Sequence, residues 1–503
     1  MCKLEIKLKQ HTPLIHFQHD QEGATLRASE VKPKLDRFIL TKLGENEQNR
    51  DVVRTKCNDD YQKAIAKIRE KFPNQTDLDN YNYGILFANE KGWIRAKGAL
   101  DYKMKIFMDK ESEEEPCVFN TNEPDFSKKK KYSKTYEKEI VKLQSYPLFF
   151  SNMDKDYEDK KEYRRFTQAF NLKIKISFFD DTFSQIIKNK ETLNQFFFTH
   201  NFGTRQSKGF GSFYIDENDE MYLPPVNKYS FKINMLKHDN WKDFYYQLFD
   251  ELSLFYNTLR SGINLKDSFG NTEFYFKSLA FMYSKDILNS KWDKRRIKEF
   301  FFKNSFDYKT KNKKGKEICI HVKGLDEQVE DYNLENNSFP LNYSNGNGVD
   351  IRDLLGLSTA ENWLYYKNAT INKSQTKFVA GRYIKIEENQ QTISRMRSPI
   401  LLKPINTQND DDEYFTIYLL FQDKEVGVPE FKDMRKICIE KKGNNRSLLL
   451  DIPSLFNSKE FLDYVLLVLD IDLTSHIDGQ FHKHPYFDIL NNIYVQLKNN
   501  VKQ

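Results

Sequence analysis

Hydrophobic residues at every second position set the strongest limit on the fold of this 503-residue chain. Leu4, Ile6 and Leu8 alternate with polar residues near the N-terminus, and the segment NLKIKISFF (171–179) repeats the pattern. Successive side chains of a β-strand point to opposite faces, so a period of two predicts a strand with one buried face. Both segments are therefore expected to be β-strands.

Helical patterns follow both predicted strands. Ser29 is placed as the N-cap of a first helix, with Pro33 in its first turn and apolar residues at 35, 38 and 39. The segment 184–200 also has helical spacing, and the glycine-rich GTRQSKGFGSF (203–213) comes directly after it. The expected order is strand, helix, glycine loop, strand.

Five further segments have clear patterns. Residues 81–108 are interpreted as strands and residues 414–422 as one strand. Residues 241–263 predict a strongly amphipathic helix, residues 273–287 are expected to continue the helical region, and residues 459–471 predict another helix. Strands and helices therefore mix in both halves of the chain.

A chain of this length exceeds one ordinary hydrophobic core, so two or three domains are expected. We expect an α+β fold. The first domain would span 1–230, with an inserted segment at about 43–165 and the glycine loop at 203–212. A mainly helical region would follow at 231–330, and a second α+β domain at 331–503.

Composition narrows the class of protein without naming a partner. Aromatic residues make up 15% and charged residues 30%, as in a globular protein, and the net charge of +6 is too small to establish a polyanion partner. The five cysteines lack C-x-x-C spacing, which fits a reducing cytoplasm and no zinc site. No apolar run approaches the length of about 20 residues that spans a bilayer, so we expect a cytoplasmic protein without a membrane partner.

The glycine loop points to a phosphate ligand. Glycines permit positive φ and close approach of another backbone, and successive amides in such a loop can bind phosphate oxygens. Arg205 and Lys208 would add positive charge for a polyanion. A tight, solvated turn with basic residues exposed by default is the alternative.

Three other glycine motifs do not fit. The nucleotide P-loop has its lysine after the second glycine, whereas Lys208 precedes Gly209. A dinucleotide fingerprint requires a third glycine where Tyr214 stands. An RNA-recognition strand shares KGFG (208–211), but the next two residues break its aromatic alternation.

Two motifs resemble the RAMP superfamily, the repeat-associated proteins of CRISPR systems. The loop resembles the superfamily's G-x-R-x-x-x-G-F-G-S pattern through Gly203, Arg205, Lys208, Gly209, Phe210, Gly211 and Ser212. Residues 12–39 are similar to its T-P-L and L-R-x-S-x-x-K pattern through Thr12, Pro13, Leu14, Leu26, Arg27, Ser29, Lys32 and Arg37. The order of segments is most like the first, fused double-RAMP subunit of type III-B Cmr effector complexes. The tryptophan-rich helix usual after L-R-x-S in that subunit is absent here.

The resemblance implies two ferredoxin-like (RRM-like) RAMP domains with a helical region between or beside them. It implies partners as well: guide (CRISPR) RNA, chiefly its 3′ part, target single-stranded RNA and other Cmr-type subunits. The RNA-binding residues carried over by motif are Arg27, Lys32, Lys34 and Arg37 at the helix start, and Gly203, Arg205, Lys208, Gly209 and Gly211 in the loop. Arg395 and Arg397 would form a second contact, with a solvated basic loop as the alternative.

An enzyme is the alternative function. Some relatives cleave precursor guide RNA or target RNA, and His16, His19 and Asp20 lie close to the first motif. The pair His482 and His484 has too few companions for a metal site. No catalytic residue, metal ligand or cofactor is assigned from the sequence.

Overall fold

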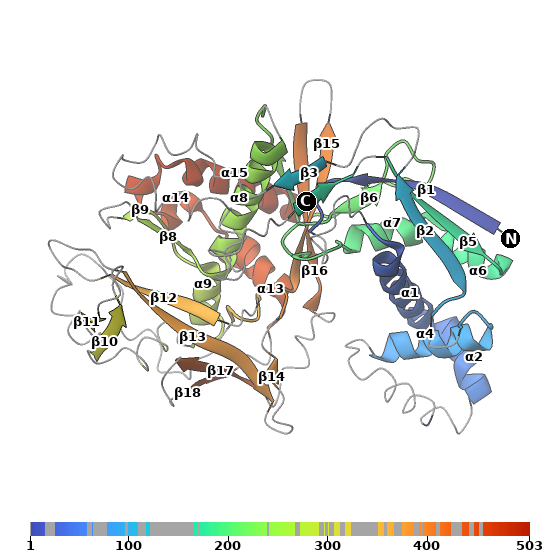
Figure 1. Ribbon diagram of the computed structural model, residues 1–503, viewed down its shortest axis with the longest axis horizontal. Coiled ribbons are helices and arrows are strands. Elements are labelled where there is room, and N and C mark those ends of the chain that lie inside the picture. Colours follow the sequence, from blue (N-terminus) through green and yellow to red (C-terminus); the bar gives the residue numbers. More distant parts are fainter. Residues whose placement is uncertain are drawn as a thin grey trace. The chain divides into compact units, whose positions relative to one another are not determined.

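The structure is a computed structural model (Figure 1). The residues that it describes are 2–15, 26–57, 63, 78–95, 99–108, 117–120, 165–169, 171–238, 241–266, 272–290, 296, 300, 306–311, 317–322, 351–356, 360–366, 375–386, 392–393, 396–408, 413–423, 435–441, 447–451 and 456–503.

The chain forms two compact units, each of which combines helices and strands, in agreement with the expected α+β class. Unit 1 comprises residues 1–255, 400–425 and 488–503, and unit 2 comprises residues 256–399 and 426–487. Unit 1 thus includes two segments from the C-terminal part of the chain. The units therefore cut across the domain boundaries expected near residues 230 and 330.

The first sheet of unit 1 is built around the two alternating segments. Its strands are antiparallel in the order β2-β5-β1-β6. Leu4 lies opposite Ile176 and Ile6 opposite Ile174, so the hydrophobic residues of the central strands share one face. Both strand predictions are confirmed. The bounds are β1 (Cys2–Gln10), β2 (Tyr102–Met108), β5 (Leu172–Phe178) and β6 (Phe213–Ile215).

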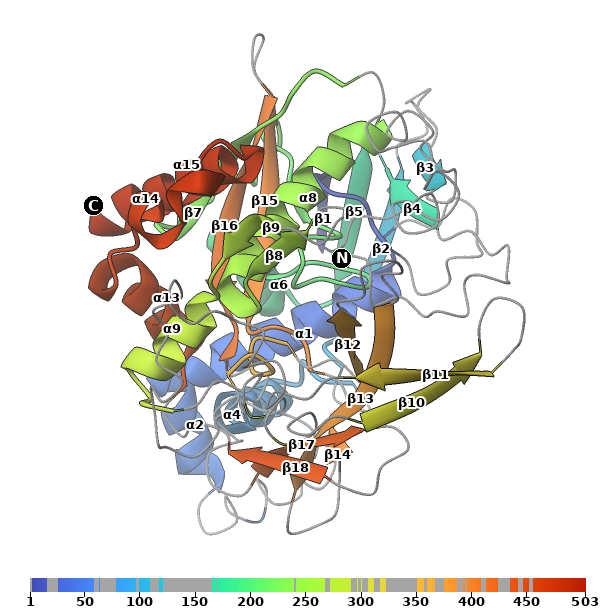
Figure 2. The ribbon, with the colours of Figure 1, turned by 90° about the vertical axis from the view of Figure 1, so that its left-hand side faces the viewer.

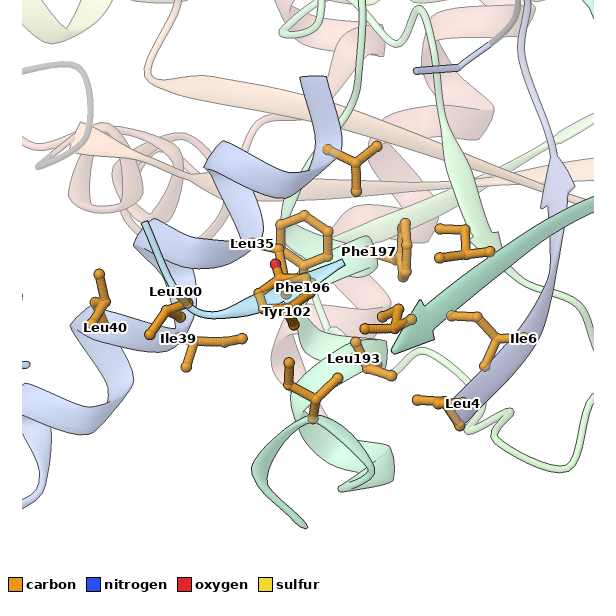
Figure 3. Packing of buried hydrophobic residues seen from close by; sticks show 14 of the residues in the cluster. Leu4, Ile6, Leu35, Ile39, Leu40, Leu100, Tyr102, Leu193, Phe196 and Phe197 are labelled. Carbon is orange, nitrogen blue, oxygen red and sulfur yellow. The ribbon is translucent and has the colours of Figure 1, made fainter. Parts of the chain in front are cut away.

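Helices cover this apolar face. Figure 3 shows Leu35 and Ile39 of α1 and Phe196 of α7 in the same buried cluster as Leu4 and Ile6 of β1. The helices are α1 (Ala28–Glu45), α6 (Asp181–Ile187) and α7 (Lys190–Thr199), with α2 (Glu47–Cys57) and α4 (Leu78–Glu90) packed beside α1. The strands β3 (Cys117–Asn120) and β4 (Arg165–Gln168) form a separate antiparallel pair in unit 1.

Side-chain caps begin two of these helices. The Asp180 carboxylate accepts the Phe183 amide at the start of α6, and Asn189 accepts the Thr192 amide at the start of α7. Helix α1 begins two residues earlier than predicted. Arg27, not Ser29, occupies its N-cap position, without a side-chain cap.

The second sheet of unit 1 joins segments far apart in sequence (Figure 2). Its order is β15-β16-β7, and all pairs are antiparallel. Phe244 of α8 packs against Phe415 of β16, and Gln496 of α15 bonds to the main chain of Lys232 in β7. The bounds are β7 (Ser230–Asn234), α8 (Trp241–Arg260), β15 (Ile400–Gln408), β16 (Glu413–Phe421) and α15 (Pro485–Lys502).

Unit 2 contains a larger sheet, β12-β13-β17-β18, with β14 paired to β13, and the hairpins β8-β9 and β10-β11. Its strands are β8 (Ile263–Lys266), β9 (Thr272–Phe276), β10 (Phe306–Lys311), β11 (Glu317–Val322), β12 (Ala360–Tyr366), β13 (Gln375–Ile386), β14 (Thr392–Ile393), β17 (Arg435–Lys441) and β18 (Ser447–Asp451). Its helices are α9 (Leu279–Asp286), α13 (Ser458–Asp463), a π-helix (Tyr464–Val468), α14 (Leu473–His476) and a 3-10 helix (Gly479–Phe481).

Two assignments from the sequence are wrong. Residues 81–90 belong to helix α4 and not to a strand. Gly84 allows this helix to pack closely against the main chain of α1 at Leu40. Residues 273–276 form strand β9, in which Phe274 and Phe276 are buried at period two. Within the span expected as an inserted segment, at about 43–165, β2 is a strand of the main sheet.

No helix in the described part of the chain is long and apolar enough to cross a membrane. The helices expected within 241–263 and 459–471 and the strand expected at 414–422 are confirmed as α8, α13 with the π-helix, and β16.

The packing of α1 on α4 yields the first prediction. A Cβ at Gly84 would collide with the Leu40 carbonyl. This carbonyl is part of the main chain of α1, which moves less easily than a flexible side chain. Overpacking costs about 1–3 kcal/mol, so Gly84→Ala should lower unfolding stability by about 3 kcal/mol in a urea titration. Gly479→Ala, where a Cβ meets nothing within 4 Å, should stay within about 0.5 kcal/mol of wild type. Equal midpoints for both variants would contradict the close packing.

Candidate nucleic-acid interface

The glycine loop (203–212) connects α7 to β6. Several of its residues have a left-handed backbone conformation. The φ angles are +75° at Gly203, +86° at Gly209 and +65° at Gly211. Arg205, which is not a glycine, also has a φ of 58°. Residues with a Cβ rarely adopt such angles. The positive φ expected from the three glycines is therefore confirmed.

The first motif contacts this loop directly. The hydroxyl of Thr12 donates to the Gly209 carbonyl at 2.7 Å and accepts the Ser212 amide at 2.9 Å. A Cβ at Gly203 would lie 2.6 Å from the Ile15 carbonyl oxygen. Segment 12–15 thus runs against the loop main chain. The two motifs, about 190 residues apart in sequence, form one continuous structure in unit 1.

The amides of the three glycines are already engaged with protein. Gly203, Gly209 and Gly211 each donate their N–H inside the chain. Their acceptors are the Glu30 carboxylate (2.6 Å), the Gln206 carbonyl (3.2 Å) and the Pro13 carbonyl (3.0 Å), respectively. In this structure these three amides are therefore bound to protein oxygens and are not open donors. The glycines serve the close approach of a neighbouring segment.

The start of α1 also reaches the loop. Glu30 holds the Gly203 amide, and Lys34 lies 3.5 Å from the same carboxylate. Lys34 Nζ donates to the Asn201 carbonyl at 3.1 Å and lies 4.7 Å from the centre of the Phe202 ring. Lys34 therefore lies beside the loop.

Lys32 faces a different part of unit 1. Its Nζ donates to Asp36 at 2.7 Å and to the Leu100 carbonyl at 2.9 Å, above the ring of Tyr102. Burial raises the pKa of Asp36, and the bonds to Lys32 oppose that rise. Because Tyr102 begins the edge strand β2, Lys32 is part of the helix–sheet packing on the side away from β6.

Arg27 and Arg37 frame the same helix. The Arg27 carbonyl accepts the first amides of α1, from Glu30 at 3.0 Å and from Val31 at 3.1 Å. Arg37 is partly exposed, and its charge acts on Tyr81 of α4. Arg37 is therefore on the α4 side of α1, whereas Arg27 lies three residues before Glu30, which binds the loop.

The tip of the loop carries the accessible cations. The side chains of Arg205 and Lys208 are partly exposed, while most of the remaining loop is buried. The Lys208 amide donates to the Arg205 carbonyl at 2.9 Å, which closes a turn. A bridge from Lys208 to Leu402 fixes this turn on β15. The tip is thus a turn fixed by main-chain bonds that carries two partly exposed basic side chains.

A buried lysine, not identified from the sequence, fastens both ends of the loop. Lys403 is fully buried, and its Nζ donates to the His200 carbonyl at 2.9 Å and the Phe213 carbonyl at 2.8 Å. Burial lowers its pKa well below the ordinary value, and the charge of Lys34 adds to the effect. A charged residue within the apolar run ILLKPI (400–405) was the available signal.

His11 is a second buried group under the loop. Its Nδ1 accepts the Asn406 amide at 3.0 Å. Burial lowers the pKa of His11 well below its ordinary value, and the charges of Lys9 and Lys403 lower it further. The imidazole is therefore neutral at physiological pH.

The remaining candidates fall elsewhere. Arg395, His16, His19 and Asp20 lie outside the described residues. Arg397 is exposed and belongs to unit 2. In unit 2, His482 bonds to the Ile477 carbonyl and the ring of His484 packs on Phe274. Within the described part of the chain, no group of three or more His, Cys, Asp or Glu residues could hold a metal ion.

Comparison with known proteins gives the class of protein that these motifs define. A family model for the Cmr1 N-terminal domain matches residues 1–263, and one for the Cmr1 C-terminal domain matches residues 275–490. The matches define a RAMP subunit of a type III-B CRISPR system, one component of a Cmr complex. The chain belongs to the Cmr1 family. No curated protein and no solved structure matches it.

The buried His11 predicts an acid-sensitive loop. The folded state excludes the proton that the unfolded state binds below a pH of about 6.5, so stability falls as the pH drops below that value. One such group costs about 1.4 kcal/mol between pH 7.5 and pH 5.5. His11→Asn retains an acceptor for the Asn406 amide but does not titrate. Between pH 7.5 and pH 5.5, the free energy of unfolding of this variant should therefore fall by about 1.4 kcal/mol less than that of wild type in urea titrations. An identical fall in both proteins would refute the neutral state of His11.

Proposed function

We propose that this Cmr1-family chain binds the sugar–phosphate backbone of guide RNA. Arg205 and Lys208 are the principal contacts, and Arg27 and Lys34 lie beside them. The observation that carries the proposal is the convergence of the two basic motifs at Gly203, whose amide donates to Glu30 at 2.6 Å. Single-stranded RNA is a polyanion, and two cationic turns on one surface suit it. The contact lies toward the 3′ part of the guide, and the target RNA is held nearby.

Side-chain contacts are the mode that the loop favours. Because the glycine amides already donate to protein oxygens, phosphates are bound by the arginine and lysine heads. Contacts to phosphate carry no sequence information. That property suits a subunit that must accept any spacer while base pairing selects the target. Within a Cmr complex this is a role in antiviral defence.

We infer further that unit 1 holds two ferredoxin-like RAMP halves. The order β2-β5-β1-β6, with α1 between β1 and β2 and α6 and α7 between β5 and β6, supports the first. The second half has the same chain order of strand, helix, strand, strand and helix, in β7, α8, β15, β16 and α15. Its sheet order β15-β16-β7 matches the order β2-β5-β1 of the first sheet. The second half would then begin at β7, with unit 2 supplied by two long insertions.

We propose a binding role in preference to a nuclease. In the described part of the loop region, His11 is buried, and the Nδ1 of His200 bonds to the Phe196 carbonyl. A general base has to reach the 2′-hydroxyl of its substrate. Incubation of the purified chain with labelled RNA tests the alternative, and cutting that depends on His16 or His19 would favour it.

The central test replaces both tip cations. Arg205→Ala with Lys208→Ala should weaken guide binding by about tenfold and by the same factor for unrelated spacer sequences, because the lost contacts are to phosphate. The slope of log affinity against log salt should fall by about 1.4, or about 0.7 for each contact. Fluorescence anisotropy with two unrelated guides measures both. Lys237→Ala with Lys483→Ala, at exposed positions outside both sequence motifs, is the matched control. Wild-type affinity in the loop variant would refute the proposal.

A further inference from the structure

The polar face of the first sheet is a second concentration of positive charge. Side chains that alternate with the buried residues of β1, β5 and β2 point away from α1 and the hydrophobic cluster. We call this surface the lysine face. Its lysines, all exposed or partly exposed, are Lys3, Lys7, Lys9, Lys103, Lys105, Lys173 and Lys175.

The register places like charges directly opposite one another. Lys7 pairs with Lys173, and Lys105 pairs with Lys175. Such pairs destabilise a sheet. Glu5 is the one acidic residue at the paired positions of this face that the structure describes, and it lies 3.4 Å from Lys175 and 3.9 Å from Lys173. Lys9 in addition lies 3.3 Å from Glu217, which follows β6. Two carboxylates do not balance seven lysines, so the arrangement works against stability.

Two exposed aromatic rings lie at the borders of the lysine face. Phe107, opposite Lys173, is 38% exposed, and Phe179, directly after β5, is 54% exposed. Arg95 and Lys103 lie 5.7 and 5.8 Å from the centre of the Phe179 ring. Exposed rings beside cations are what a single nucleic acid strand needs, because bases stack on the rings and phosphates meet the charges.

We propose that the lysine face binds single-stranded RNA, with phosphates on the lysines and bases stacked on Phe107 and Phe179. Lysines two residues apart on a strand are about 7 Å apart, and neighbouring strands are about 5 Å apart, so the face offers a grid of cations to a flexible backbone. An acidic protein segment would use the charges but leave the two rings without a role. This surface is on the opposite side of the sheet from α1 and is separate from the glycine loop.

The charge test uses Lys105→Gln with Lys175→Gln in the full chain. Removing a like-charge pair should leave the thermal unfolding midpoint unchanged or higher, so a loss of binding cannot be attributed to misfolding. Affinity for labelled oligouridylate should fall about tenfold, with a salt slope lower by about 1.4. Lys237→Gln with Lys483→Gln, at exposed positions outside β1, β2 and β5, should bind as wild type does.

The stacking test uses Phe179→Ala against Phe179→Trp. The alanine variant should bind oligoadenylate about tenfold more weakly, and the tryptophan variant should match wild type, because any aromatic ring stacks a base. The loop variant Arg205→Ala with Lys208→Ala separates the two surfaces. Loss in that variant alone would overturn the lysine face and leave the proposed function intact. Loss in the face variants alone would support the lysine face and count against the loop. Wild-type RNA affinity in the face variants, with weakened binding of another Cmr subunit, would assign the face to protein and refute the proposal.

Discussion

Close contact between two main-chain segments determines the rest of the interface. Segment 12–15 lies so near the glycine loop that a Cβ at Gly203 would lie 2.6 Å from the Ile15 oxygen. The loop is also folded tightly on itself, since a Cβ at Gly211 would overlap the Phe202 carbonyl. Glycine alone allows both this approach and the required positive φ. The reciprocal hydrogen bonds then fix the loop on the end of β1, and the carboxylate of Glu30 adds α1 to the same point. The place of the basic tip follows from this contact.

The loop also connects the two sheets of unit 1. One end continues into β6 of the first sheet, and the turn before it bonds to β15 of the second, where the Leu402 amide donates to the Ser207 carbonyl at 3.1 Å. Lys403 bonds to carbonyls at both ends of the loop, and Phe210 stacks on Phe249 of α8 with ring centres 3.8 Å apart. The residues with the motif of a ligand loop are therefore also a structural joint. This explains why so few of its polar groups face solvent.

Local patterns in the sequence predicted what depends on local physics. The alternation at Leu4, Ile6 and Leu8 predicted β1 because a half-buried strand requires it, and the three glycines predicted positive φ because few other residues tolerate it. The acceptors of the glycine amides could not be predicted, since Pro13 and Glu30 reach them only through the tertiary fold. The return of residues 400–421 to unit 1 was likewise invisible, because long-range strand pairing leaves no periodic signal. Residues 81–90 were misread since tyrosine and phenylalanine favour strands until helix packing decides otherwise.

The internal use of the glycine amides changes how such a loop can hold a polyanion. A loop with open amides is ordered by its ligand, and the entropy of ordering then weakens binding. Here protein oxygens bind the loop amides, so the turn that carries Arg205 and Lys208 is already formed without a ligand. Long side chains on a rigid turn can adjust to different phosphate positions without moving the main chain. A rigid joint with adaptable cations therefore suits a strand whose sequence varies but whose charge does not.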